Sequence, residues 1–155
     1  MSEHRGGYMR LALEQAQKAG MAGNRAVGAV IVRNGVVVGK GGNCRESTPD
    51  PVGHAEIGAL RDAVANLGGL DLSDCTLYTT LEPCPMCAGA IVVNGIQRVV
   101  VGKMHSGDRR WGDYDVHKVL DMVGFGTRVE EGILEDDCAA VLHEYDVKNG
   151  RVPVA

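Results

Sequence analysis

The chain has 155 residues, of which 45% are hydrophobic and 23% are charged, so it is long enough to bury the core of one globular domain over residues 1–155. Its 16 Lys and Arg against 20 Asp and Glu give a formal net charge of -4, which argues against a broad basic surface for nucleic acid. No apolar run approaches the roughly 20 residues of a membrane span. The first seven residues are too polar for a signal peptide, so we expect a cytoplasmic protein with no membrane partner.

The first half of the chain carries alternating signals for helix and strand. Alanines recur near the 3.6-residue period in the first helix, and Asn34-Gly35 between two β-branched runs is a strong hairpin signal. The expected elements of this half are a helix over 8–20, strands over 26–33 and 36–39, a polar loop over 41–53 and a helix over 53–67.

The second half continues the alternation. Pro83 and Pro85 fit the start of a helix, because the first-turn N–H groups lack partners in any case. Alternating helices and strands predict an α/β fold of three layers, with helices on both faces of the sheet. The expected elements are strands over 75–81, 98–102 and 127–130, helices over 84–94, 115–123 and 135–145, and a polar loop over 103–114.

Two short motifs supply the chemistry of the chain, His54-Ala55-Glu56 and Pro83-Cys84-Pro85-Met86-Cys87. Two thiolates and one imidazole suit zinc, and three protein ligands leave the fourth tetrahedral position open for water. Cys84 and Cys87 are one helical turn apart, and His54 begins the preceding helix, so we expect zinc between two helix starts. Glu56, two residues from a ligand, is the best acid–base candidate.

Other interpretations of these residues remain open at this stage. Cys-x-x-Cys alone also fits a redox pair or a structural zinc site, although the upstream His-x-Glu favours catalysis. Trp111 is the only tryptophan and stands in the 103–114 loop. We expect that loop to be a lid and Trp111 to cover a flat substrate, with a subunit contact or ordinary packing as the alternative.

Together the motifs resemble the cytidine/deoxycytidylate deaminase superfamily, whose signature is His-x-Glu followed by Pro-Cys-x-x-Cys. The likeness runs from the first helix to about Tyr145. Within the superfamily, the chain is most similar to fungal-type cytosine deaminase, guanine deaminase and tRNA adenosine deaminase. The supporting stretches are 27–32, Asn43, 50–51, 77–83, 84–91 and 94–102.

The resemblance implies a five-stranded mixed sheet, a homodimer and one zinc per chain held by His54, Cys84 and Cys87. Zinc would activate a water for attack on the amine-bearing carbon. Glu56 would move that water's proton to a ring nitrogen and then protonate the leaving amine.

The resemblance also implies substrate contacts from three further residues. The Asn43 amide would hold the ring edge, with a simple turn as its alternative role. The Ala55 N–H would bind a ring oxygen, and the Glu82 carbonyl would accept from the departing amino group.

Departures from the known branches guide the expected substrate. Ala55 stands where the fungal-type enzyme has Gly, and residues 149–155 lack the aromatic and acid that close its pocket. The region over 130–137 is acidic where the tRNA enzyme is basic. We therefore expect a free base, cytosine first (pyrimidine salvage) and guanine second. A tRNA-editing adenosine deaminase and a zinc-stabilised binding module without activity are the alternatives.

Overall fold

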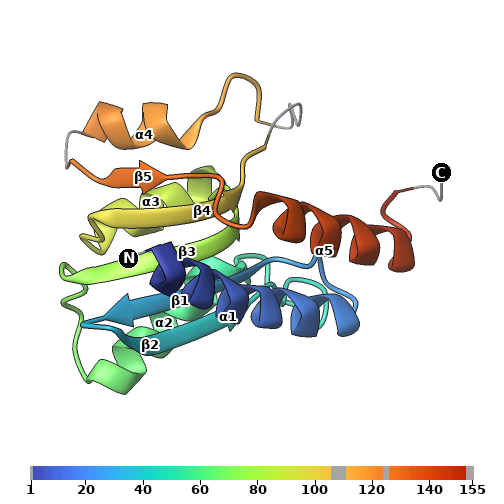
Figure 1. Cartoon of the computed structure of the whole chain (residues 1–155), viewed down its shortest axis with the longest axis horizontal. Coiled ribbons are helices and arrows are strands. Elements are labelled where there is room, and N and C mark those ends of the chain that lie inside the picture. The colour runs from blue at the N-terminus through green and yellow to red at the C-terminus, as the bar shows by residue number, and fades with distance from the viewer. Residues whose placement is uncertain (1, 106–110, 124–125, 153–155) are drawn as a thin grey trace.

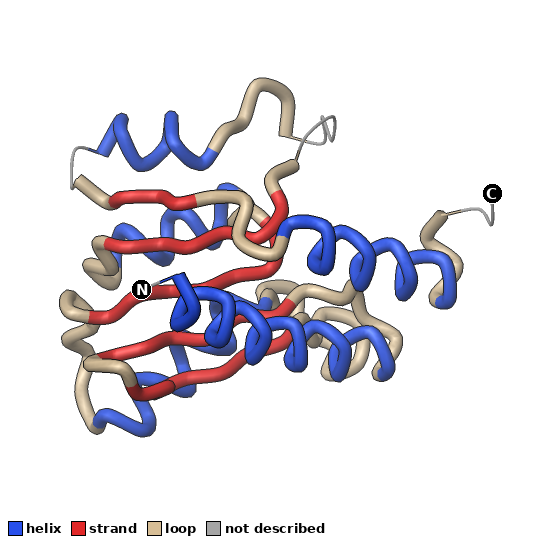
Figure 2. Tube along the Cα trace, viewed as in Figure 1, coloured by secondary structure: helices blue, strands red, loops and turns tan. Residues whose placement is uncertain are grey.

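The structure is a computed structural model that describes residues 2–105, 111–123 and 126–152 (Figure 1). Helices and strands alternate along the chain, as expected (Figure 2). In chain order the elements are α1 (Ser2–Met21), β1 (Gly28–Arg33), β2 (Val36–Gly42), α2 (Ala55–Leu67), β3 (Cys75–Leu81), α3 (Pro85–Val93), β4 (Arg98–Lys103), α4 (Val116–Val123), β5 (Arg128–Glu130) and α5 (Glu135–Lys148).

Among the described residues, five strands form one sheet in the order β2-β1-β3-β4-β5. β1 is antiparallel to both β2 and β3, whereas β4 is parallel to β3 and to β5. The mixed sheet implied by the family resemblance is therefore confirmed. Asn34 and Gly35 both adopt positive φ angles, 50° and 77°, which is the backbone that the hairpin signal predicts.

Helices cover both faces of the sheet, which confirms the three-layer α/β/α fold (Figure 1). Side chains of a strand alternate between its faces, and β1 shows this directly. Val30 and Val32 pack in the core under α1 and α5, whereas Ala29 and Ile31 pack in the core under α2, α3 and α4. The alternation fixes which face of the sheet each helix can cover.

Two glycines of β2 let α2 lie directly against the strand. A Cβ atom at Gly41 would come 2.3 Å from the carbonyl oxygen of Ala55, and one at Gly39 would come 2.4 Å from that of Ala59. Larger residues would push the first turn of α2 away. The start of α2, where His54 lies, is thus positioned by backbone contact.

The element bounds differ from the prediction mainly at the ends. α1 begins at Ser2 and not at residue 8, and Arg5 on this extra turn bonds to Glu130 of β5. β2 continues to Gly42, because Gly41 and Gly42 pair with β1 although glycine has little strand preference. Residues 106–110 of the expected lid lie outside the described residues. We find no helix in the described ranges that is long and apolar enough to traverse a bilayer.

Candidate active site

His54 and Cys84 occupy equivalent positions at the starts of two helices. Each is the N-cap residue of its helix with an extended backbone, His54 before α2 and Cys84 before α3, and Pro85 follows as the first residue of α3. The N–H groups of a first helical turn lack intrahelical partners and favour negative charge. A thiolate at Cys84 is therefore stabilised by the start of α3, the helix that positions it.

The three expected zinc ligands lie within coordination reach of one ion. Nδ1 of His54 is 3.4 Å from Sγ of Cys84 and 3.6 Å from Sγ of Cys87. All three ligand atoms lie within 4.8 Å of one another. A tetrahedral zinc with ordinary Zn–S and Zn–N lengths would hold sulfur and nitrogen about 3.6 Å apart. The distances and the donor types both fit zinc.

The two cysteines share one negative charge. Hydrogen bonds from Cys87 and His54 lower the pKa of Cys84 to about 4, so this residue is a thiolate. The pKa of Cys87 is raised by its contact with the Cys84 sulfur, by burial and by the nearby Glu56 carboxylate. A second thiolate here would face two anions, and a cation between the sulfurs removes that repulsion. A bound metal ion would therefore allow both cysteines to be thiolates.

Glu56 is fixed beside these ligands by its own hydrogen bonds. The side chain is 3% exposed, its Oε1 lies 3.0 Å from Oγ1 of Thr79, and its Oε2 accepts from Cys87 over 3.3 Å. Burial raises the pKa of Glu56 above the ordinary value for a glutamate, towards the pH range in which a carboxylate can both accept and donate a proton. A bound cation would act in the opposite direction.

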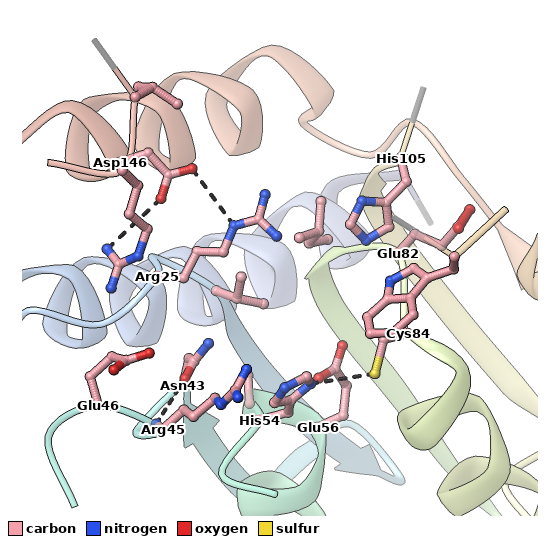
Figure 3. Close-up of a pocket in the computed structure, with 16 residues that line it drawn as sticks. Arg25, Asn43, Arg45, Glu46, His54, Glu56, Glu82, Cys84, His105 and Asp146 are labelled. Atoms are coloured by element: carbon pink, nitrogen blue, oxygen red, sulfur yellow. Dashed lines mark hydrogen bonds and ion pairs between the residues drawn. The ribbon is translucent and has the colours of Figure 1, made fainter. Parts of the chain in front are cut away.

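One cavity of about 250 Å³ opens over this group (Figure 3). Cys87 does not line the cavity, but its sulfur lies within 4.8 Å of the ligand atoms of His54 and Cys84. The structure therefore brings together every residue that the sequence singled out. The predicted site residues that line the cavity are Asn43, His54, Ala55, Glu56, Glu82, Cys84 and Trp111.

Comparison with known proteins decides the family. Residues 2–103 match the family model described as the cytidine and deoxycytidylate deaminase zinc-binding region. The chain belongs to this deaminase family.

Relatives of this deaminase are similar over most of their length. It is 36% identical to a tRNA-specific adenosine deaminase of Bacillus subtilis (strain 168), over 89% of this chain and 86% of that one. A structure from work on A-to-I editing by tRNA:A34 deaminases has TM-score 0.78 and 34% identity over 87% and 98% of the two chains. Guanine deaminase from Nitrosomonas europaea has TM-score 0.78 and 27% identity over 91% and 84%.

Thr79 is a site residue of the deaminase that sequence reasoning missed. Its hydroxyl is fully buried between Glu56 and the carbonyl oxygen of Leu81, which is 3.1 Å away. In the sequence, Thr79 is one threonine in an apolar strand, where threonine is common because of its strand preference. Only the fold shows its hydrogen bond to Glu56.

Replacing Thr79 with valine should lower kcat about 2–10-fold, because one hydrogen bond to the Glu56 carboxylate is lost. Zinc content should stay unchanged, and serine at the same position should restore turnover. Thr76→Val, on the opposite face of β3, is the matched control. Steady-state kinetics of the zinc-loaded proteins measures the effect, and wild-type kcat in Thr79→Val would show that Glu56 needs no such support.

Asn43 makes a turn and also faces the cavity. Its Oδ1 accepts from the backbone N–H of Arg45 over 3.0 Å, and its own backbone N–H donates to Val27 over 3.0 Å. The amide nitrogen is thereby left to the cavity side, where Asn43 is drawn next to Arg45 (Figure 3). The two roles considered for this residue are therefore compatible.

The segment after β4 contributes two aromatic residues near the ligands. Trp111 is 44% exposed and lines the cavity. The Tyr114 hydroxyl donates to the carbonyl oxygen of Pro83, and this bond links the segment to the residue that precedes the ligand Cys84. Glu82 is buried, and burial together with the nearby Asp115 raises its pKa to about 7.

Five charged residues that the sequence did not single out also line the cavity: Arg25, Arg45, Glu46, Asp146 and Arg151. Arg25 precedes β1, whereas Asp146 and Arg151 lie at the far end of the chain, in and after α5. No local pattern links positions so distant in sequence. An acid thus reaches the cavity from α5, although residues 149–155 contain none.

Proposed function

We propose that the chain is a zinc-dependent hydrolytic deaminase of a purine, and that its substrate is an adenosine presented in tRNA. The observation that carries the chemistry is the buried Glu56 carboxylate beside His54, Cys84 and Cys87 at the floor of a cavity. The identity to a tRNA-specific adenosine deaminase over 89% of the chain supports the substrate. The expected cytosine deaminase activity and role in pyrimidine salvage gain no support from the relatives reported above.

Each site residue then has a role in converting adenosine and water to inosine and ammonia. Zinc, when bound, supplies a Lewis acid that lowers the pKa of a water. Glu56 accepts one proton of that water and delivers it to a ring nitrogen, and then moves the remaining proton of the added hydroxyl to the amine, which leaves as ammonia while the carbonyl forms. The Asn43 amide and the Ala55 N–H hold the ring edge, the Glu82 carbonyl accepts from the amino group, and Trp111 covers the base.

The distribution of charge favours RNA more than the net charge suggests. The acidic start of α5, Glu135 to Asp137, lies at the opposite end of the helix from Asp146, which lines the cavity. From residue 135 to residue 146 the helix rises about 16 Å. The acidic cluster is therefore not placed to repel an RNA backbone at the cavity, whose lining holds three arginines together with Glu46 and Asp146.

A substrate comparison tests this proposal. We expect the zinc-loaded protein to convert a tRNA with adenosine at the wobble position to inosine, with a kcat/KM that falls steeply as salt rises. Guanine, cytosine and free adenosine should be much poorer substrates. Salt-insensitive turnover of a free base, with the tRNA left unchanged, would contradict the proposal.

Guanine is the second candidate substrate. The likeness to guanine deaminase from Nitrosomonas europaea favours it, and so does a cavity of about 250 Å³, which is small for a ligand site. The same comparison decides between the two, because guanine carries no phosphate and its turnover should not depend on salt.

We infer a homodimer that pairs through α3. The helix consists of apolar and small residues, yet Val93 is 85% exposed and Met86 is exposed as well. A helix that is apolar all round is normally covered on every side. A second copy of the chain would provide that cover.

A further inference from the structure

We propose that Arg25 forms an anion subsite of the cavity and takes a phosphate attached to the ribose of the target nucleoside. The inference rests on the proposed function for the base, but its central observation is independent of it. This observation is an arginine that is fixed in the wall of the cavity while its terminal donors remain unused.

Asp146 holds Arg25 by one nitrogen only. Nε of Arg25 is 3.6 Å from Oδ2 of Asp146, and its side chain is 26% exposed. Figure 3 shows the two terminal nitrogens of Arg25 pointing away from Asp146. Within the described ranges they have no hydrogen-bond or ion-pair partner. The fork of the guanidinium is therefore available to a ligand.

The local charge of this cluster is positive. Asp146 is only 8% exposed and also lies 4.0 Å from Nη1 of Arg151, whose Nη2 donates to the carbonyl oxygen of Gly23 over 2.8 Å. Two guanidinium groups face one carboxylate, which leaves one positive charge. Both contacts are longer than hydrogen bonds, and Oδ1 of Asp146 has no hydrogen-bond partner among the described residues. The carboxylate therefore does not saturate either arginine.

The wall that carries Arg25 is rigidly built. The neighbouring Asn24 is buried, and its Oδ1 accepts from the backbone N–H groups of Glu46 and Ser47 over 2.9 and 3.0 Å. Nδ2 of Asn149 donates to the carbonyl oxygen of Asn24 over 3.2 Å. These bonds join the end of α1, the loop before α2 and the end of α5. Arg25 is thus held in place before any ligand arrives.

A phosphate fits this arrangement better than a neutral base alone. A guanidinium fork can donate two parallel N–H bonds to phosphate oxygens, whereas a neutral base offers no charge to match. Arg45 lines the same cavity as a third arginine, and it is exposed, as is the neighbouring Glu46. Because Arg25 and Cys84 line one cavity, a base placed at the zinc ligands can have its ribose phosphate near Arg25.

The test measures binding through Trp111, the only tryptophan, which lines the cavity. The zinc-loaded full chain is titrated with adenosine and with adenosine 5′-monophosphate, as wild type and as Arg25→Gln, Arg25→Lys and Arg10→Gln. Arg10 is an exposed arginine of α1 that does not line the cavity, so it is the matched control. Zinc content and circular dichroism confirm that each variant is folded.

We expect Arg25→Gln to reduce the preference for the monophosphate over adenosine about 10–100-fold, as loss of a charged hydrogen bond does. Arg25→Lys should retain part of the preference, and Arg10→Gln all of it. Equal preference in wild type and Arg25→Gln would overturn the proposal. So would an equal loss in Arg10→Gln.

Activity assays on two substrates identify the source of the phosphate. The same variants are assayed on adenosine 5′-monophosphate and on an RNA hairpin with adenosine in its loop. Loss of kcat/KM on the hairpin alone assigns the subsite to a phosphodiester, and loss on the monophosphate assigns it to a free nucleotide. If no adenosine substrate is deaminated, the proposed function fails, while the Trp111 titration still decides the role of Arg25.

Discussion

Glu56→Ala should keep its zinc and its fold but lose turnover by at least about 10²–10⁴-fold, the range for one general acid–base group. The loss should lie at or above that range, because this single carboxylate serves every proton transfer of the reaction. Its position supports the role, since Glu56 is 3% exposed and is held by Thr79 and Cys87 next to the metal ligands.

Single-turnover kinetics with zinc analysis of the same samples measures this effect. Glu56→Gln separates proton transfer from the loss of volume, because the amide has nearly the shape of the carboxylate. Glu14→Ala, which removes an exposed glutamate of α1, is the matched control. If kcat of Glu56→Ala stayed within about tenfold of wild type, Glu56 would not be the proton shuttle.

The arrangement of the site was predictable from sequence where short-range rules decide it. The Cys84–Cys87 spacing and the helix starts at residues 54 and 84 determine where the ligands lie, and the structure confirms that they meet. Alternation along β1 likewise determines which side chains face each helix layer. Helix starts and strand alternation depend on neighbours within one or two turns of the chain, whereas the meeting of His54 with the two cysteines was expected from the ligand types and the family resemblance.

Features that depend on distant pairs outside any motif were not predictable. The first turn of α1 contacts β5 through Arg5 and Glu130, and Arg25 meets Asp146 across 121 positions of sequence, the difference between their numbers. The expectation of cytosine as the first substrate gained no support from the relatives, whereas guanine, the second, has a structural neighbour in its favour. Net charge counts every residue equally, whereas binding depends on the few charges that line the cavity.

Cys84→Ser should lose zinc. Three ligands are the minimum for a catalytic zinc, so none is spare, and Cys84 is the cysteine that is already ionised, with a pKa of about 4. A serine hydroxyl is a far poorer ligand than a thiolate. The affinity for zinc should fall by more than the roughly 10–100-fold that loss of a supporting hydrogen bond costs. Cys44→Ser, a cysteine outside the ligand cluster, should keep normal zinc.

Zinc titration of the metal-free protein tests the central claim most directly. Zinc is added stepwise to wild type and to Cys84→Ser, and inosine formation from tRNA is measured at each step. We predict that wild-type activity rises linearly and stops at one zinc per chain, whereas Cys84→Ser shows no such rise. Activity that does not depend on zinc, or equal activation of both proteins, would contradict the account.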